Sequence, residues 1–452
     1  MSNITRQIVL IGGGYASIWA YRSIVEELMI EMMAGYVRIM IICPDEFHVF
    51  HGWTAECLVG IIGDQNRLSR LSEILKYAEF TKGRAISIDP VLKIIKVEMN
   101  SGANKIITYD QLLLGTGSND SISVEGLDRN AFQLKSENDY HKAKMQIQYL
   151  IQKAAGPNTS EARKILRFTI AGSGFTGVEI ASNLAEFIQD VKKQYPALRH
   201  VNPVIYLINS KEDLLPGLKS DFNRMKKYSE EILHKYGVII LNKIKLTRVT
   251  NQRAYLSDGS FIESEMVIST IGQTRSVLRG GENLDRDSEN RIFANSFLQT
   301  KNDPNIWVAG DISNAKSCRN QNTCPSNALW AIKQGEHVGR NIARAILNQP
   351  LKPFSYRGLG QCASLGIGKG IGELYGIQFT GWSAWMMRWF FFQYFMPSKK
   401  TMWREIADWL FYFSTGRRKY ACIRSYEMLQ IPKSAKARTE EFDKLQMLVN
   451  PI

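Results

Sequence analysis

Residues 166–179 read LRFTIAGSGFTGVE, an apolar run that passes into three closely spaced glycines. The run Leu166–Ala171 predicts a buried strand, residues 178–186 predict a helix, and Val204–Ile208 predicts the next strand. A strand, a glycine turn, a helix and a strand form the unit that binds a dinucleotide. Its glycines let the backbone approach a pyrophosphate, and its helix N-terminus presents amide N–H groups to the phosphates.

The same pattern occurs once more, near the start of the chain. Residues 8–17 read IVLIGGGYAS, and a predicted helix (18–33) and strand (38–42) follow. The position of the third glycine is held by Ser17, which is small enough to pack the helix on the strand. One such match is weak evidence, but two matches in the correct context predict an α/β fold with two Rossmann-like dinucleotide-binding units. A third glycine-rich segment, 366–372, lacks the Ser or Thr of a phosphate-binding loop after Lys369, so we predict a turn there.

Two further predicted strands end in small residues. The segment 109–114 leads into Gly115-Thr116-Gly117, and Asn305–Ala309 leads into Gly310-Asp311. Each is compatible with an ordinary strand end. In a flavoprotein, a Gly-Asp pair at such a position places a carboxylate near the ribityl and phosphate oxygens of the flavin.

Composition limits the classes of function. The chain has 452 residues, 44% hydrophobic and 22% charged, which is typical of a globular protein of two or three domains. We find no signal peptide, and no run reaches the roughly 20 apolar residues of a spanning helix. The six cysteines and six histidines show no ligand spacing, so no metal site is predicted. The net charge of +14 favours an anionic partner, but there is no nucleic-acid-binding motif.

The C-terminal part of the chain combines aromatic and basic residues. Thirteen of the 32 residues in 382–413 are aromatic, against 10% for the whole chain. Apolar residues recur at helical spacing on both sides of Pro397, which predicts two amphipathic helices lying in a membrane interface. A helical hairpin packed as core, a homodimer contact and a docking face for a membrane protein remain alternatives. The expected headgroup contacts are Lys399, Lys400, Arg417, Arg418 and Lys419. Arg388, Gln393, Arg404, Glu405 and Asp408 interrupt the apolar runs, so neither helix should span.

From about Gln7 to Tyr420 the chain resembles the two-dinucleotide FAD/NAD-linked reductases, and among them the type II NADH dehydrogenases (NADH:quinone oxidoreductases). The resemblance implies an FAD-binding domain in two parts (1–120 and 290–380), an NAD(P)H-binding domain (121–289) and a membrane- or partner-binding C-terminal segment (381–452). It also implies the cofactor contacts. For FAD they are Gly12, Gly13, Gly14, Tyr15, Ala16, Ala85, Thr116, Gly117, Gly310, Asp311 and Ala328. For NADH or NADPH they are Gly172, Gly174, Phe175, Thr176, Gly177, Glu179, Asn209, Ser210, Lys211 and Gly272.

The chain departs from the family pattern at several positions. Cys43 stands where an acid is expected to contact the FAD ribose, and Asp45 or Glu46 is the possible substitute. Asn209 stands where an acid would accept hydrogen bonds from the ribose 2′-hydroxyl and repel a 2′-phosphate, so NADPH is expected to be tolerated or preferred. In the helix under the flavin, Leu329 and Lys333 replace glutamines that help to frame the quinone.

Few residues are expected to act directly in the chemistry, because hydride transfer to a flavin needs alignment more than an acid or base. The candidate catalytic residues are Glu179, for orienting the nicotinamide carboxamide, and Gln334 and Lys333, for the reduced flavin or the acceptor. The predicted function is a non-proton-pumping NAD(P)H:quinone oxidoreductase, peripheral on the cytoplasmic face of a membrane. The alternatives are a flavoprotein subunit of a larger membrane electron-transfer complex, a sulfide:quinone reductase that uses Cys318 or Cys324, and a redox sensor without turnover.

Overall fold

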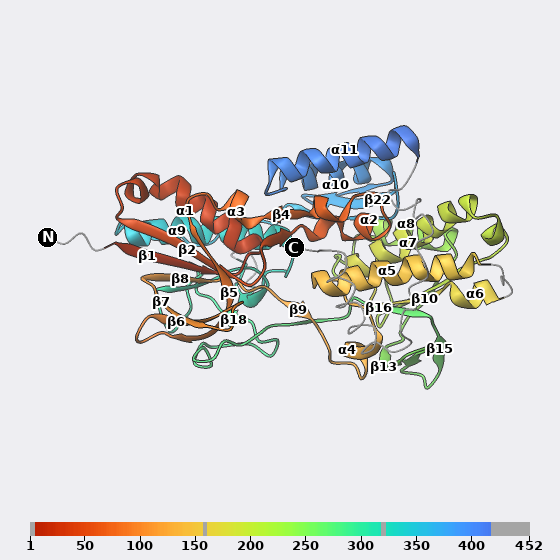
Figure 1. Cartoon of the computed structure of the whole chain (residues 1–452), viewed down its shortest axis with the longest axis horizontal. Coiled ribbons are helices and arrows are strands. Elements are labelled where there is room, and N and C mark those ends of the chain that lie inside the picture. Colours follow the sequence, from red (N-terminus) through yellow and green to blue (C-terminus); the bar gives the residue numbers. More distant parts are fainter. Residues whose placement is uncertain (1–4, 157–160, 318–321, 417–452) are drawn as a thin grey trace.

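The computed structural model describes residues 5–156, 161–317 and 322–416 of the chain. It contains two main sheets, one mixed and one parallel, side by side along the long axis of the molecule, with the C-terminal helices lying across one side of both (Figure 1).

The first sheet has seven strands in the order β19-β8-β1-β2-β5-β6-β7. The first five run parallel and the last two antiparallel. Their bounds are β1 (Arg6–Ile11), β2 (Val37–Cys43), β5 (Glu79–Asp89), β6 (Ile94–Met99), β7 (Asn104–Thr108), β8 (Gln111–Leu114) and β19 (Ile306–Val308). Strand β19 joins this sheet after almost 200 intervening residues, and its register aligns Val308 with Leu114, and Leu114 with Ile11. Three predicted strand ends therefore meet at one edge of the sheet.

Two long helices cover one face of this sheet. These are α1 (Tyr15–Met33) and α9 (Ala328–Ile346), and they pack closely because glycines face the partner backbone. A Cβ at Gly335 would lie 2.3 Å from the carbonyl oxygen of Ala16, and one at Gly339 would lie 2.4 Å from that of Ala20. The contact places the N-terminus of α9 beside the first glycine turn.

The second sheet has four parallel strands in the order β12-β11-β10-β16. Helix α7 (Phe175–Gln194) packs against three of them, and an antiparallel meander lies beside them. The bounds are β10 (Arg167–Ala171), β11 (Val204–Ile208), β12 (Val238–Leu241) and β16 (Met266–Ser269), with β13 (Leu246–Thr250), β14 (Arg253–Leu256) and β15 (Phe261–Glu263) in the meander. Both predicted strand–turn–helix–strand units are thus confirmed.

A narrow pair of strands connects the two sheets. Strand β9 (Asn119–Asp120) leaves the first sheet, and β17 (Gln273–Thr274) returns to it, paired antiparallel. The other elements are β3 (Phe47–Val49), α2 (Thr54–Leu58), β4 (Leu68–Arg70), α3 (Leu71–Ile74), α4 (Leu127–Asn130), α5 (Glu137–Ala154), α6 (Ala162–Ile165), α8 (Asn223–Lys235), β18 (Ile292–Phe293) and β20 (Ser313–Asn314).

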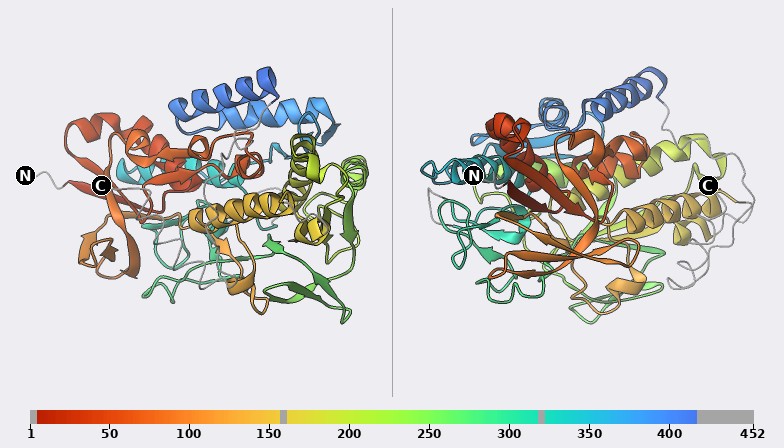
Figure 2. Two further views of the ribbon diagram at one scale, coloured as in Figure 1. Left: turned by 45° about the vertical axis from the view of Figure 1, so that its right-hand side comes forward. Right: turned by 60° about the vertical axis from the view of Figure 1, so that its left-hand side comes forward.

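The C-terminal part forms a small meander and a helical hairpin. Strands β21 (Gly360–Ser364), β22 (Gly370–Leu374) and β23 (Ile377–Thr380) precede α10 (Trp382–Tyr394) and α11 (Lys399–Thr415). The predicted turn is found between β21 and β22, where Gly366 and Gly368 have φ of +109° and +68°, but Gly370 and Gly372 belong to β22. In the views of Figure 2 the two helices, in blue, stay on one side of the molecule. None of the described helices is long and apolar enough to cross a membrane.

Candidate functional site

The first glycine turn forms an open cradle at the N-terminus of α1. Gly12 has φ of +110°, and a Cβ there would lie 2.4 Å from the carbonyl oxygen of Gly115, so only glycine fits. At Gly14, the N-cap residue, an added Cβ would meet no described atom within 4 Å. The turn is therefore closed on the side of the sheet and open in front of the helix, as a bound pyrophosphate requires.

Ser17 fits the third glycine position because a glycine across the sheet makes room for it. Its side chain is fully buried, and its hydroxyl donates to the carbonyl of Ile11 at 3.5 Å. A Cβ at Gly115 would lie 2.4 Å from the Ser17 Oγ. The loss of one glycine is thus accommodated by another directly after β8.

No acid lies at position 43, where the family pattern expects a contact with the FAD ribose. Cys43 is buried, and its Sγ would lie 2.9 Å from a Cβ at Gly13, so it supplies packing and no carboxylate. Glu46 pairs with Lys82 at 2.6 Å. A residue that we did not predict, His48, is buried with its Nδ1 3.1 Å from the carbonyl oxygen of Gly13, and burial lowers its pKa to about 4. The imidazole is therefore neutral at pH 7 and fixes the turn.

The Gly-Asp strand end meets a lysine and a serine from the connection between the sheets. Ser118 donates to Asp311 Oδ2 at 2.6 Å, and Lys135 donates to the Ser118 hydroxyl at 2.6 Å. Lys135 Nζ lies 4.0 Å from the Asp311 carboxylate. Burial lowers the pKa of Lys135, while Asp311 and Asp120 act in the opposite direction. Lys135 was missed because it lies between motifs, within a segment without pattern.

The two candidates in α9 have structural partners. Gln334 is 2% exposed, and its Oε1 accepts a hydrogen bond from the amide of Gly310 at 2.7 Å. Lys333 pairs with Glu336 at 2.9 Å. Gln334 therefore supports the Gly-Asp turn from inside the protein. Ala328 is exposed at the N-terminus of α9, which Asn327 caps.

The second glycine turn has the same geometry as the first. Gly172 has φ of +105°, and a Cβ at Gly177 would lie 1.8 Å from its carbonyl oxygen. At Gly174, the N-cap of α7, an added Cβ would again meet no described atom within 4 Å. Phe175 and Thr176 begin α7 and are partly buried and exposed, respectively. This cradle is likewise open in front of its helix.

The side chain of Asn209 points into the protein and is hydrogen-bonded to the second glycine turn. It is fully buried, and its Oδ1 accepts from the Ser173 hydroxyl at 2.6 Å and from the Lys211 amide at 3.0 Å. Its Nδ2 donates to Asn242 at 2.8 Å. In this structure the amide of Asn209 is therefore used within the protein, and its contact with NADH or NADPH stays a prediction. Ser210 and Lys211 are exposed at the end of β11.

Glu179 belongs to a buried ion cluster. Its Oε1 accepts from the Ser364 amide at 2.8 Å and lies 2.9 Å from Arg388 of α10. Arg388 also pairs with Glu56 of α2 through contacts of 2.6 and 3.3 Å. Burial raises the pKa of Glu179 to about 7, and Arg388 partly offsets the effect. Neither Glu56 nor the inward direction of Arg388 was predicted, because both depend on contacts between distant segments.

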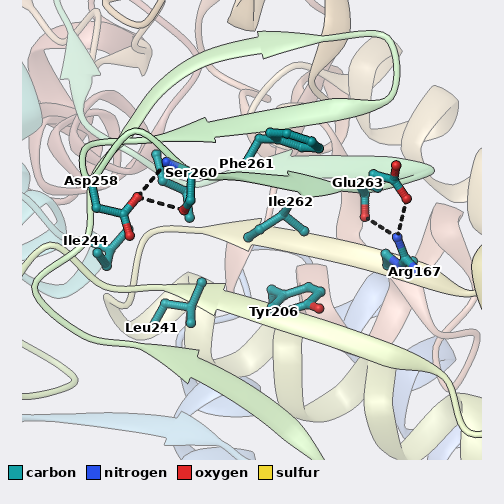
Figure 3. Close-up of a pocket in the computed structure, with 10 residues that line it drawn as sticks. Arg167, Tyr206, Leu241, Ile244, Asp258, Ser260, Phe261, Ile262 and Glu263 are labelled. Atoms are coloured by element: carbon teal, nitrogen blue, oxygen red, sulfur yellow. Dashed lines mark hydrogen bonds and ion pairs between the residues drawn. The ribbon is translucent and has the colours of Figure 1, made fainter.

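A cavity of about 480 Å³ lies elsewhere, between β11, β12 and the meander strand β15 (Figure 3). Its lining includes Tyr206, Phe261 and the ion pair between Arg167 and Glu263, and it contains none of the predicted site residues.

The last predicted nucleotide contact, Gly272, lies on an exposed turn beyond β16 with φ of +66°.

Comparisons with known proteins agree with this architecture. A type II NADH:quinone oxidoreductase of Staphylococcus haemolyticus is 25% identical over 396 residues, which is 86% of this chain and 94% of that protein. The solved structure of NDH2 from Plasmodium falciparum in complex with NADH superposes with a TM-score of 0.79 at 15% identity, over 91% of this chain and 99% of that one. The sulfide:quinone oxidoreductase of Aquifex aeolicus superposes with a TM-score of 0.68 at 16% identity, over 89% of this chain and 93% of that one.

These structural neighbours share the fold. The family model described as pyridine nucleotide-disulphide oxidoreductase matches residues 6–335, a span that contains both glycine cradles and the Gly-Asp turn. The chain therefore belongs to the pyridine nucleotide-disulphide oxidoreductase family.

Proposed function

We propose that this protein is an FAD-dependent NAD(P)H:quinone oxidoreductase that does not pump protons and works on the cytoplasmic face of a membrane. The observation that carries the proposal is the pair of glycine cradles, each open in front of a long helix. Two cradles suit an enzyme that keeps one dinucleotide and exchanges another. The relative of Staphylococcus haemolyticus named above, a type II NADH:quinone oxidoreductase, supports the same reaction class.

The residues around the first cradle fit FAD. Gly14 leaves space for the pyrophosphate at the N-terminus of α1, where backbone amides favour anions. Asp311 lies at the neighbouring strand end, where its carboxylate can accept from ribityl hydroxyls, and Ser118 and Lys135 hold it there. The bound flavin would supply the hydride-accepting chemistry, and the protein supplies alignment. FAD would bind in the domain formed by residues 1–120 and 290–380, against the contacts that the family resemblance implies.

The second cradle suits NADH or NADPH, in the domain of residues 121–289. Gly174 leaves space for the pyrophosphate, and Glu179 lies one helical turn further along α7, at the side that faces α10. Exposed Lys211, together with the absence of a carboxylate at position 209, favours acceptance of a 2′-phosphate. The nicotinamide end would then reach Glu179.

The C-terminal hairpin, α10 and α11, supports attachment to a lipid surface because it exposes many large apolar side chains. Three charged residues that we expected to interrupt its apolar runs are buried: Arg388, Glu405 and Asp408 are at most 3% exposed. Arg388 and Asp408 pair with the body of the protein, as Asp408 does with the amide of Gly63 at 2.7 Å, and Glu405 accepts from Gln393 of α10 at 2.5 Å. The outer surface carries an aromatic face. This aromatic face consists of Trp382, Phe390, Tyr394, Trp403, Leu410, Phe411 and Phe413, which are 43–82% exposed.

Such a face is unfavourable in water and favourable in the interfacial layer of a membrane. Exposed Lys399, Lys400 and Arg404 lie on the same hairpin, where they can contact anionic headgroups. The other expected headgroup contacts, Arg417, Arg418 and Lys419, lie outside the described residues. Attachment here would hold the flavin site close to a quinone pool dissolved in the bilayer.

One alternative acceptor is favoured by a specific observation. Leu329 and Lys333 replace two glutamines in the helix under the flavin, and the aromatic face would also fit a membrane protein. Transfer of electrons to a partner subunit would explain both features. A sulfide-dependent reaction is less well supported, since Cys324 is 4% exposed. Cys318 lies outside the described residues.

Anaerobic stopped-flow reduction of the FAD-loaded protein tests the proposal. Addition of NADH or NADPH should bleach the flavin, and a short-chain quinone should then reoxidise it. Bleaching without reoxidation by quinone would favour the partner-subunit alternative. If neither nucleotide bleaches the flavin, the proposed function is wrong.

A further inference from the structure

The buried cluster around Arg388 contains one cation and two carboxylates. Arg388 is 1% exposed and Glu56 is 1% exposed, and Arg388 contacts both oxygens of Glu56. The guanidinium also donates to the carbonyl of Gly52 at 2.8 Å and lies 4.4 Å above the centre of the Phe392 ring. Glu56 is therefore a better partner for Arg388 than a carboxylate that contacts it through one oxygen, because a bidentate pair is the strongest geometry between arginine and a carboxylate.

Glu179 is the second carboxylate, and it meets the cluster with one oxygen only. Its Oε1 accepts from the Ser364 amide and from Arg388. Its Oε2 takes part in neither contact, and 16% of the side chain stays exposed. Glu179 therefore has one oxygen fixed and one oxygen available.

Through the charge balance of the cluster, Glu56 affects the ionisation of Glu179. The charged or titratable groups that act on Glu179 are Arg388 from α10 and Glu56 from α2, and Cys362 of β21 acts on the same cluster. Burial raises the pKa of the Cys362 thiol to about 12, so it is neutral. Since Glu56 already balances Arg388, ionisation of Glu179 would leave the buried cluster with a net negative charge.

We propose that Glu56 is a positioning residue for hydride transfer: by pairing with Arg388, it leaves Glu179 with an open oxygen and an exchangeable proton for the nicotinamide carboxamide. The inference rests on the proposed function. A Glu179 that can be neutral or charged near pH 7 can donate to the carboxamide oxygen or accept from the carboxamide nitrogen. Without Glu56, Arg388 would hold Glu179 as a fixed carboxylate.

The substitution Glu56→Gln separates these cases without leaving the arginine unpaired, because Glu179 remains as its counterion. The midpoint of Glu179 titration should fall by about 1 to 3 pH units, because Arg388 would no longer be balanced by Glu56 and would act on Glu179 alone. Glu56→Asp keeps the charge and should restore most of the shift. Glu73→Gln is the matched control, since it removes a carboxylate that pairs with the same hairpin, at Lys400, away from Glu179.

The titration is measured directly by infrared difference spectroscopy of the carboxyl group, with Glu179→Gln as the spectral reference. The pH profile of flavin reduction by NADH in the same variants gives the second readout. An unchanged midpoint in Glu56→Gln overturns the proposal. If Glu56→Gln does not fold, the unsubstituted protein decides: a midpoint near pH 7 supports the proposal, and one in the ordinary range of glutamate overturns it. The carboxyl titration needs no nucleotide, so a failure of the proposed function would appear separately, as absence of flavin reduction at every pH.

Discussion

Gly14 and Gly12 differ in what a methyl group would meet, and this difference yields a sharp test of the FAD site. Gly14 has extended backbone (φ −84°, ψ −173°), which any residue adopts, and an added Cβ points into open space. We therefore expect Gly14→Ala to fold. The weaker helix cap costs up to about 1 kcal/mol, and the reduced entropy of the unfolded chain offsets about 0.4–1 kcal/mol of it. The methyl group would occupy the space left for the cofactor pyrophosphate.

The expected loss falls on cofactor binding. Forcing one methyl group into a packed contact costs about 1–3 kcal/mol, which raises the Kd for FAD about 5- to 150-fold. Titration of the apoprotein with FAD, followed by flavin fluorescence, measures this change, and thermal unfolding without FAD measures the fold.

Two matched variants complete the design. Gly12→Ala should destabilise the apoprotein itself, because its methyl would lie 2.4 Å from a backbone oxygen at φ of +110°. Gly174→Ala should bind FAD normally and weaken only NAD(P)H, because its Cβ points into the second cradle. An unchanged Kd for FAD in Gly14→Ala, in a folded protein, would refute the placement of the cofactor.

Three further changes have expected outcomes. Lys211→Glu should lower kcat/KM for NADPH relative to NADH by about tenfold or more, because an acid at this exposed position repels a 2′-phosphate, and steady-state kinetics with both nucleotides checks the ratio. Trp403→Glu with Phe411→Glu should reduce binding to anionic vesicles in a sedimentation assay by about tenfold or more, whereas Val91→Glu, at a more exposed apolar position on the β5–β6 turn, should not. Burial raises the pKa of Glu405 to about 8, so its contribution to stability is present at low pH and is lost as the pH rises from about 4.5 through 8. At pH 9, Glu405→Gln should therefore be more stable than the unsubstituted protein by up to about 5 kcal/mol and should unfold at a higher denaturant concentration. If the difference between the two proteins is the same at pH 9 as at pH 5, this explanation is wrong.

Local pattern was sufficient to predict the two glycine cradles. The glycines at 12 and 172 are required by the positive φ of the turn within their own strand–turn–helix unit, so they appear as spacing in the sequence. The meeting of Gly115 and Gly310 at one sheet edge could also be anticipated, since parallel strands end together.

The remainder of the site depends on pairs that are distant in sequence. Helical periodicity locates the apolar and polar faces of α10 and α11, but it does not determine which face lies inside. In most surface helices the apolar face is buried. Here the buried face is mixed, since Trp385 and Trp409 lie inside together with Arg388 and Asp408. The buried charges have partners, because Glu56 offers Arg388 a counterion and Asn66 offers Asp408 a hydrogen bond, which α2 and the following turn bring there from over 300 residues away.

The ion cluster also links the hairpin physically to the proposed nucleotide site. Arg388 is held by α2 of the first dinucleotide unit and contacts Glu179 of the second, while the opposite surface of its helix carries Phe390 and Tyr394. Displacing the hairpin would remove Arg388 from both carboxylates and leave two acids buried without a cation, which costs several kcal/mol. In the membrane-bound state that we propose, the hairpin would keep Arg388, and with it Glu179, in position relative to the first cradle. On this basis we expect that removing the hairpin impairs hydride transfer itself, and not only access to quinone.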